Sequence, residues 1–361
     1  MKKALFTGIP LALALTSNAQ DTTAVTGSPV TFSAYVEGYY SYDFNKPPDH
    51  NRPAFLFNYN RSNEFNVNLA FVRASYNKER VRATFAIAAG TYMNANYSAE
   101  PGVIKNIYEA DAGYKLSNKR NLWLDIGILP SHIGWESAVG KDNWTLTRSI
   151  VAENSPYYEG GARLTYTTDN GKIAVSALAL NGWQRITRVN GNSLMSWGTQ
   201  LLVKPSDKVT LNYSTFLGTD SPDSTRRWRF YHDIYGIIQF SEKIGLTAGF
   251  DIGTEQVRKR SSDHNVWYSP VVIVRYTPVP KWAIAARGEY FNDKDQVIVV
   301  TGTQHGFRTS GVSLNLDYLP TSNIALRVEG RTFHSKDDIF LKDERPRRND
   351  TAVTFSVAVA F

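Results

Sequence analysis

Apolar and polar residues alternate along this chain in segment after segment, and a period of two is the pattern of β-strands that have one apolar and one polar face. The segment at residues 31–44, TFSAYVEGYYSYDF, is typical, because Phe32 and Val36 alternate with Ser33 and Glu37. We count about sixteen such segments. The last one, TAVTFSVAVAF, ends on Phe361 itself, so the C-terminus is predicted to be part of the structure rather than a frayed end.

The connections between these segments alternate between short and long. Short turns occupy residues 77–80, 116–121, 167–171, 205–208, 241–243, 277–281 and 319–323, and longer polar segments such as 45–63, 129–156, 254–265, 292–307 and 334–349 lie between them. One end of the strands therefore has tight hairpins and the other has loops, which is the layout of a transmembrane up-and-down antiparallel β-barrel. An even number of strands lets the last strand pair with the first and close the barrel without a free edge.

The first residues predict export. Lys2 and Lys3 precede an apolar run at residues 4–15, and small residues at 17–19 fit a cleavage site. We therefore predict a signal peptide at residues 1–19 and an outer-membrane β-barrel at residues 20–361. A buried N-terminal helix is the alternative, which the polar residues after the short run disfavour. Loss of the two leader lysines lowers the formal charge from +7 to +5, and an exported chain is not expected to bind nucleic acid.

Three further observations narrow the fold. After the leader, no stretch approaches the ~20 apolar residues of a membrane helix. The chain has no cysteine, which excludes disulfides and thiolate metal sites. Among soluble alternatives, a β-propeller would show a repeated four-strand blade, and a β-sandwich pair or a β-helix is also disfavoured. In the second predicted strand the parity changes near Phe71 and Val72, which indicates a β-bulge there or a misplaced boundary.

Aromatic residues near the predicted strand ends fit the two interfacial girdles of a membrane barrel. The candidates are Tyr92, Tyr114, Tyr166, Trp183, Trp197, Tyr276, Trp282, Tyr290 and Tyr318.

Three segments resemble the OmpL-like family of β-barrel porins. They are residues 128–166, beginning ILPSHIGWESAVG, the NGW at 181–183, and residues 311–333, GVSLNLDYLPTSNIALRVEGRTF. The resemblance covers nearly all of the mature chain and implies a porin, through which small hydrophilic solutes or ions diffuse passively. A terminal phenylalanine also resembles the assembly signal of outer-membrane barrels, which implies recognition of Phe361 by the barrel-assembly machinery.

A sixteen-strand barrel is wide enough to leave an aqueous channel, so inward-facing charges are candidate pore-lining residues. Arg327, Glu329 and Arg331 share one face of a predicted strand, and Arg287 with Glu289 lies two strands away. Such charges could organise the field in the pore, or they could be paired wall charges without a role in selectivity. The inward parity also includes Glu37, Asp43 and Asp125. The residues chosen from it as wall candidates are Glu109, Asp111, Arg163, Arg287, Glu289, Asp317, Arg327, Glu329 and Arg331.

The longest connection, residues 129–156, adds Trp135, Glu136 and Arg148 as candidates for a constriction. In general porins a long loop folds inward to narrow the channel, and by that resemblance we expect the constriction here. A loop that covers the mouth from outside, or one that plugs the lumen, fits its length equally well.

Basic clusters lie in or beside the long connections. They are Arg226, Arg227 and Arg229, then Arg258, Lys259 and Arg260, and finally Lys342, Arg345, Arg347 and Arg348. They could contact anionic lipid headgroups or attract anionic solutes, or they could be solvated loop charges.

We therefore expect an outer-membrane porin of a Gram-negative cell, with at most a mild anion preference, in contact with outer-membrane lipids and lipopolysaccharide. Homo-oligomerisation is left open. The alternatives are a plugged structural or adhesive barrel and a hydrolase that uses one of the six histidines. No HExxH, P-loop or GxSxG motif is present, so neither catalysis nor a cofactor or metal site is predicted.

Overall fold

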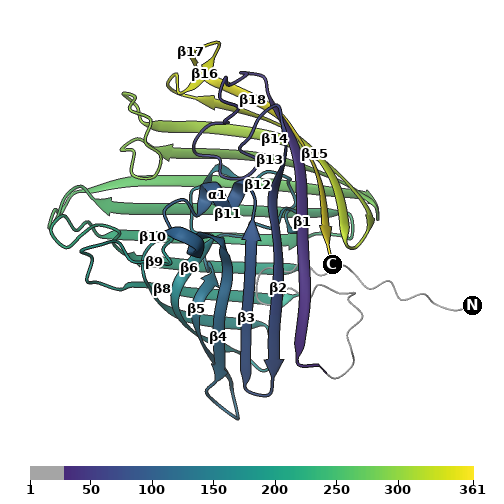
Figure 1. Ribbon diagram of the computed structural model, residues 1–361, viewed down its shortest axis with the longest axis vertical. Helices are drawn as coiled ribbons and strands as arrows, with labels where there is room; N and C mark the ends of the chain where they lie inside the picture. Colours follow the sequence, from purple (N-terminus) through teal and green to yellow (C-terminus); the bar gives the residue numbers. More distant parts are fainter. Residues whose placement is uncertain (1–27) are drawn as a thin grey trace, which may run out of the picture.

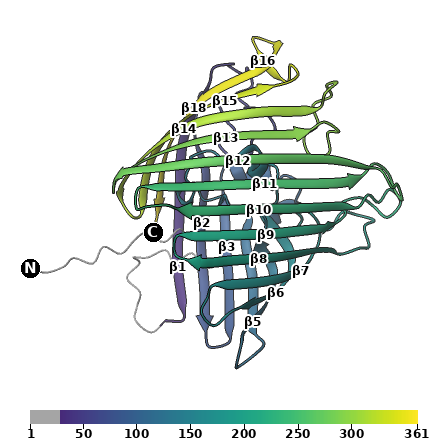
Figure 2. The same ribbon diagram turned by 180° about the vertical axis from the view of Figure 1, so that it is seen from behind.

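Sixteen antiparallel strands form a closed barrel in the structure, a computed structural model that describes residues 28–361. Neighbours in the sequence are neighbours in the barrel, except that β18 lies between β15 and β1 (Figures 1 and 2). The predicted up-and-down barrel and its strand number are confirmed. The predicted signal peptide, residues 1–19, lies outside the described residues.

The barrel strands are β1 (Val30–Asp43), β2 (Phe65–Lys78), β3 (Val81–Ala89), β4 (Ile107–Lys115), β5 (Asn121–Pro130), β6 (Tyr158–Thr167), β7 (Ile173–Leu180), β8 (Ser196–Ser206), β9 (Val209–Gly218), β10 (Arg229–Gln239), β11 (Ile244–Gln256), β12 (His264–Val279), β13 (Trp282–Asp293), β14 (Phe307–Thr321), β15 (Ile324–Ser335) and β18 (Asn349–Ala360). A separate hairpin consists of β16 (Phe340–Lys342) and β17 (Arg345–Arg347). The helices are α1 (Thr91–Asn96) and α2 (Ile150–Glu153), with 3-10 turns η1 (Gly102–Asn106) and η2 (Gly140–Asp142). In residues 28–361, no helix has the length and apolar character needed to cross a membrane.

The two faces of the strands differ as the alternation predicts. On β14, Val312 and Leu314 point outward and are 57% and 62% exposed, whereas Asn315 and Asp317 point inward and are buried. Large apolar side chains are also exposed on the outer face of other strands, such as Ile234 on β10, Phe250 on β11 and Val272 on β12. An apolar outer face and a polar inner face suit a barrel that sits in lipid.

The C-terminal strand closes the barrel, as predicted. β18 pairs with β1 from Tyr35 opposite Ala360 to Asp43 opposite Ala352. The pairing continues at Phe361, whose N–H donates to the carbonyl oxygen of Ala34 at 2.9 Å. Because lipid offers no partner for a free backbone group, this seam completes the hydrogen bonding of both strands.

β2 contains a bulge, as predicted, but the bulge lies at Asn68 and not near Phe71 and Val72. Glu37 pairs with Leu69 and Gly38 with Val67, which leaves Asn68 as the extra residue. Hydrogen bonds of the Asn68 side chain explain the position of the bulge. Its amide oxygen accepts the N–H of Tyr59 at 3.0 Å, and its amide nitrogen donates to Glu37 at 3.2 Å. A bulge turns this side chain inward to make both bonds.

The predicted aromatic girdle is correct in part. Tyr114, Trp197, Tyr276 and Trp282 are 41–55% exposed on the outer face. Tyr92 and Trp183 were wrongly placed in it, because they are 0% and 9% exposed and pack inside the molecule. Both belong to loop segments that fold inward, which a strand-end position in the sequence does not reveal.

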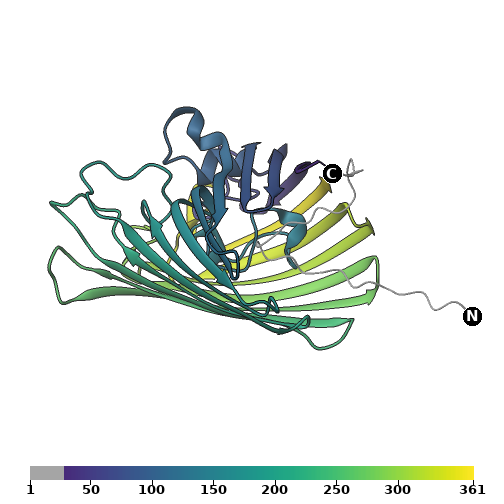
Figure 3. The ribbon, with the colours of Figure 1, turned by 90° about the horizontal axis from the view of Figure 1, so that it is seen from below.

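The barrel interior is not empty. Viewed from below in Figure 3, loops and helical turns lie between the strands of the opposite walls. The connections on one side of the barrel are short turns and those on the other are longer, as predicted. The lumen is therefore shaped by the long connections.

Candidate functional site

The connection between β5 and β6 enters the barrel and binds its inner wall. We call residues 131–157 the lumen loop; it contains η2 and α2. The N–H of Thr147 donates to the Glu329 carboxylate at 2.5 Å, and the N–H of Ile150 donates to the Glu289 carboxylate at 2.6 Å. Since these carboxylates belong to β15 and β13, the middle of the lumen loop is fixed to that part of the wall.

Arginines of the same wall bind carbonyl oxygens of the lumen loop. Arg287 on β13 donates to the carbonyl of Thr147 at 2.6 Å. Arg327 on β15 donates to the carbonyls of Gly140 at 2.6 Å and Asn143 at 3.0 Å. Irregular backbone inside a barrel needs partners for its polar groups, and these guanidinium groups supply them.

The charges that hold the loop also pair with one another. Arg287 contacts Glu329 at 2.9 Å, Arg331 contacts Glu289 at 2.6 Å, and Arg327 contacts Asp317 at 2.6 Å. With Asn315, whose amide oxygen accepts the N–H of Leu146 at 3.1 Å, these residues form what we call the anchor set: Arg287, Glu289, Asn315, Asp317, Arg327, Glu329 and Arg331.

The anchor set is buried from solvent and carries no net charge. Each of its members is at most 7% exposed, and its three arginines balance its three carboxylates. The structure thus brings together six of the predicted wall candidates and places them beneath the lumen loop. Buried pairs of this kind add little net stability, but removal of one partner leaves an unpaired buried charge, which costs several kcal/mol.

Two of the predicted loop candidates organise the loop itself. The buried guanidinium of Arg148 donates to the Tyr59 hydroxyl at 3.0 Å and to the carbonyl of Ala138. Glu136 accepts the N–H of Ser149 at 3.0 Å and also its hydroxyl. Both side chains face other parts of the protein, so they shape the loop from within.

Two tryptophans fix the loop against β10 and β11. Trp135, the third loop candidate, lies 5.6 Å from the ring of Tyr235. A Cβ atom at Gly249 would overlap its indole, and a Cβ atom at Gly245 would press on the indole of Trp144. Glycines on the wall therefore make room for the loop's largest side chains.

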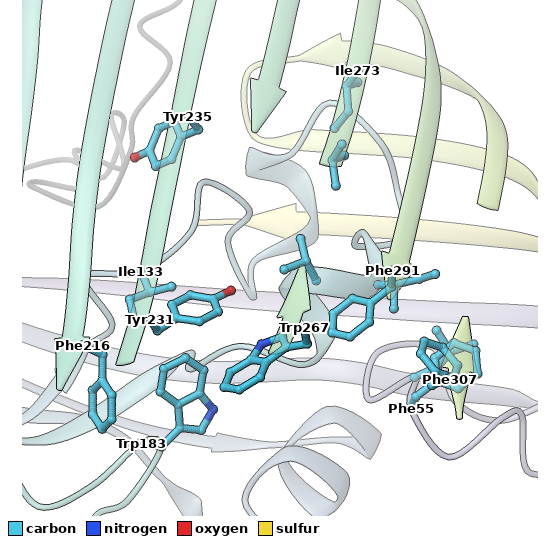
Figure 4. Close-up of a cluster of buried hydrophobic side chains, with 14 of the residues drawn as sticks. Phe55, Ile133, Trp183, Phe216, Tyr231, Tyr235, Trp267, Ile273, Phe291 and Phe307 are labelled. Atoms are coloured by element: carbon cyan, nitrogen blue, oxygen red, sulfur yellow. The ribbon is translucent and has the colours of Figure 1, made fainter. Parts of the chain in front are cut away.

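The connection between β1 and β2 covers another part of the interior. Phe55 packs edge-on against Phe307, with ring centroids 4.8 Å apart, as Figure 4 shows. Glu153 of the lumen loop accepts the N–H of Phe57 at 2.8 Å and of Asn58 at 3.1 Å. The two loops thus support each other inside the barrel.

A cluster of inward aromatic rings lines the wall beside these loops (Figure 4). Trp183 packs edge-on against Phe216 and Tyr231, and the Arg229 guanidinium lies over the rings of Trp183 and Trp267. The sequence reasoning missed this cluster. The one feature of the sequence that indicates this cluster is the position of Tyr231 and Trp267 in the alternating pattern, which predicts that both side chains point inward.

Residues around α1 fill the remaining side. The rings of Tyr97 and Tyr158 stack with centroids 3.9 Å apart. Glu100 accepts the N–H groups of Ile186 at 2.8 Å and Thr187 at 3.1 Å. This ties the connection between β3 and β4 to the connection between β7 and β8.

The inner face of β2 to β6 carries a second group of charges, which we call the charged wall: Arg73, Arg82, Glu109, Asp111, Asp125 and Arg163. Arg73 pairs with Glu109 at 2.9 Å, and Arg82 pairs with Asp125 at 2.5 Å. The Arg82 side chain is 36% exposed, and those of Arg73 and Glu109 are 14% and 13% exposed. The remaining predicted candidates, Glu109, Asp111 and Arg163, lie here and not with the anchor set.

The tip of the lumen loop turns toward this wall. Asp142 is exposed and Lys141 is partly exposed. On the other side of the tip, the N–H of Lys141 lies 3.4 Å from the Tyr35 hydroxyl on β1. The charged wall and the loop tip therefore include inner charges that remain in contact with solvent.

Sequence reasoning omitted Arg73 and Arg82 from the candidates. Arg82 lies between the apolar residues Val81 and Ala83, so the alternation along the strand predicts that its side chain points inward. Arg73 was hidden because the parity of β2 was assigned with the bulge in the wrong place. Within residues 28–361, no group of three or more histidine, aspartate or glutamate side chains could hold a metal ion.

A family model described as "Putative beta-barrel porin-2, OmpL-like" matches residues 29–361. The chain belongs to this porin family. The expected family is thereby confirmed, and with it an outer-membrane barrel of the porin type. No curated protein matches the chain.

Several solved structures of outer-membrane proteins share the fold of this family member. The anion-selective porin from Comamonas acidovorans has a TM-score of 0.59 at 9% identity and covers 92% of this chain and 99% of its own. OmpT of Vibrio cholerae has a TM-score of 0.59 at 10% identity, with 92% and 97% covered. A mutant of the Rh. blastica porin has a TM-score of 0.55 at 9% identity, with 92% and 100% covered. At these identities the similarity establishes the fold alone.

Proposed function

We propose that this porin lets small hydrophilic solutes and ions diffuse passively through the space between the lumen loop and the charged wall. The observation that carries the proposal is the difference in exposure between the two groups of charges: the anchor set is buried, whereas Arg82 is partly exposed and the tip residue Asp142 is exposed. In this proposal the lumen loop narrows the channel and does not plug it. The anchor set acts as its support.

The charges along the proposed passage are balanced. The charged wall has three arginines and three carboxylates, and the loop tip adds Lys141 and Asp142. Opposite charges on facing sides orient permeating ions without excluding either sign strongly. A mild anion preference would then come from the basic loops around the mouth. The porin of Comamonas acidovorans is described as anion-selective.

Export and assembly complete the proposal. Residues 1–19 would direct the chain across the inner membrane, and Phe361, which is 56% exposed at the barrel seam, would be available to the barrel-assembly machinery. One of the similar structures, OmpT of Vibrio cholerae, is described in a trimer form, and a homo-oligomer of this chain is proposed on that basis.

A channel without catalytic activity is proposed here, because the buried histidine that contacts a carboxylate, His132, does not have the partners of a hydrolase triad. His132 and His305 each contact a carboxylate, Glu159 at 2.8 Å and Asp337 at 2.7 Å. The second ring nitrogen of His132 contacts the carbonyl oxygen of Thr215, which cannot be a nucleophile. A triad needs a hydroxyl or thiol at that position.

Single-channel recording of the refolded mature protein in planar bilayers tests the proposal. Stable ohmic steps are expected. In a salt gradient, Asp111→Asn should move the reversal potential toward anion preference and Arg163→Gln toward cation preference, while the exposed hairpin variant Arg345→Gln should leave it unchanged. A correctly inserted wild-type barrel that stays silent would contradict the open passage and favour a plugged barrel. Equal responses from all three variants would contradict the placement of the passage.

A further inference from the structure

A basic pocket lies at the rim of the barrel on the side of the long connections. It has a volume of about 350 Å³ and is lined by Arg226, Trp228, Gln256, Lys259 and Arg260. These residues come from the connection that precedes β10 and from the end of β11 with the connection that follows it. Three of the five lining residues are cationic and none is acidic. We call it the rim pocket.

The rim pocket faces away from the lumen. Arg229 points inward, since its guanidinium lies 5.2 Å from the ring centroid of the buried Trp183. Trp228 immediately precedes β10, and its carbonyl oxygen accepts the N–H of Gln256 at 2.9 Å, so the pairing with β11 extends to it. Neighbouring side chains in such a pairing point to opposite sides, so Trp228 points outward. Its cross-strand neighbour Gln256 does the same, because Glu255, which pairs with Arg229 at 2.7 Å, points inward.

Directly along the outer face lies the apolar surface of β10 to β12. Phe230, Ile234, Phe250 and Val272 are 41–50% exposed there. That surface is the part of a membrane barrel that contacts lipid tails. A tryptophan next to cationic side chains at the edge of such a surface lies at the level of lipid headgroups.

Hydrogen bonds fix the backbone around the rim pocket, and its cationic side chains keep N–H groups that could bind a ligand. The N–H of Trp228 donates to Gln256 at 3.0 Å, and the Gln256 amide donates to the carbonyl of Ser261 at 2.9 Å. The Nε of Arg226 is buried and has no hydrogen-bond partner in the part of the chain that the structure describes. Lys259 donates to a backbone carbonyl, that of Asp223, at 2.5 Å, so its charge is not neutralised by that contact.

One carboxylate stands beside the rim pocket. Asp223 accepts hydrogen bonds from Ser193 and from Arg226, at 2.7 Å in the second case, and these lower its pKa to about 2. It is therefore ionised at neutral pH and offsets one of the three positive charges. A net positive charge of two remains, which matches the charge of a phosphate monoester or of two phosphodiesters.

We propose that the rim pocket binds the phosphate group of a lipid in the leaflet that surrounds this end of the barrel. Arg226, Lys259 and Arg260 contact the phosphate, Trp228 packs against the headgroup, and the acyl chains lie along the apolar face of β10 to β12. The outward direction of the pocket favours a lipid phosphate over a free phosphate, because a dissolved anion on its way to the lumen would not pass through it. The proposal is independent of conduction.

The test is native mass spectrometry of the folded mature barrel released from detergent micelles, titrated with three probes. These are a bis-phosphorylated glucosamine glycolipid (lipid A), the same glycolipid without its phosphates, and inorganic phosphate. The site variant combines Arg226→Gln, Lys259→Gln and Arg260→Gln. Its matched control combines Lys342→Gln, Arg345→Gln and Arg347→Gln, which removes three exposed cations from the β16–β17 hairpin.

The wild type should bind the phosphorylated glycolipid more tightly than either other probe. The site variant, which loses three cations, should lose about a hundredfold in affinity, given about 1 kcal/mol for each basic side chain near a membrane surface, and the control should lose much less. If the triple variant does not fold, Lys259→Gln alone should weaken binding in the same direction. Equal loss in both triple variants, equal binding of the dephosphorylated glycolipid, or equal binding of inorganic phosphate would overturn the proposal.

Discussion

Arg287 and Thr147 are 140 residues apart in the sequence, yet the guanidinium of Arg287 donates a 2.6 Å hydrogen bond to the carbonyl oxygen of Thr147. This contact joins the barrel wall to the lumen loop at the centre of the anchor set. The same guanidinium contacts Glu329, which accepts the N–H of Thr147. Wall and loop are therefore parts of one buried network, and a change in the wall should be measurable in the channel.

Removal of Arg287 should destabilise the barrel and loosen the loop. In Arg287→Met, Glu289 and Glu329 lose a buried partner, so the free energy of unfolding should fall by about 3–5 kcal/mol. Denaturant titration in detergent micelles measures this loss, and single-channel traces should become noisier as the loop moves. Arg345→Met, on the exposed hairpin, is the matched control.

The double variant Arg287→Gln with Glu329→Gln distinguishes pairing from packing. If the buried charges are coupled, the double variant should lose less stability than the sum of the two single variants. Additive losses would mean that the pair contributes through its separate contacts with the loop.

The fit of Trp135 against Gly249 gives a second prediction. In Gly249→Val the new side chain overlaps the indole, so either the loop shifts or the wall strains, at a cost of about 1–3 kcal/mol. The thermal midpoint should fall and the tryptophan emission should change. Gly288→Val is the control, because nothing lies within 4 Å of a Cβ atom at that position and valine suits a strand. Equal effects of both substitutions would contradict a specific contact.

The sequence determines the barrel through local signals, which explains why the strand number, the closing strand and the alternating connections were predictable. Alternation on β14 and β15 also identified the inward direction of Asp317, Arg327, Glu329 and Arg331 correctly. What alternation cannot show is which surface covers an inward side chain. The contacts of Arg327 with Gly140 and Asn143 span more than 180 residues, and no local pattern encodes them.

Two errors have a local origin instead. The bulge at Asn68 is stabilised by side-chain bonds to Tyr59 and Glu37, partners that periodicity alone does not suggest. Trp183 follows β7 directly, where a girdle residue is common, but the N–H of Trp183 donates to Asp220 at 3.0 Å, and the loop folds inward. In both cases a polar contact outside the strand decides the direction.

The contact between His132 and Glu159 should make stability depend on pH. Burial alone would lower the pKa of His132, but attraction to Glu159, with hydrogen bonds to Glu159 and to the Thr215 carbonyl, outweighs it and raises the pKa above the ordinary value of 6.5. The folded state thus holds the proton more tightly than the unfolded state does. The contribution is complete below about pH 6.5 and is lost as the pH rises through the pKa of the folded state.

Denaturant titrations of the wild type and of His132→Gln measure this effect. The stability difference between the two proteins should be larger at about pH 5 than at about pH 9, where the wild-type imidazole is neutral. A difference that stays constant with pH would show that His132 contributes through packing and not through its charge.

Deletion of Phe361 should impair assembly more than folded stability. Its backbone adds one pair of hydrogen bonds to the seam with Ala34, and its side chain is 56% exposed, so the refolded variant should lose only about 1–2 kcal/mol. In cells, the amount of folded protein in the outer membrane should fall much further if the terminal phenylalanine is the assembly signal. Phe240→Ala, an exposed phenylalanine beside the short β10–β11 turn, is the matched control and should assemble normally. Normal membrane levels of the Phe361 deletion would assign the residue to the seam alone.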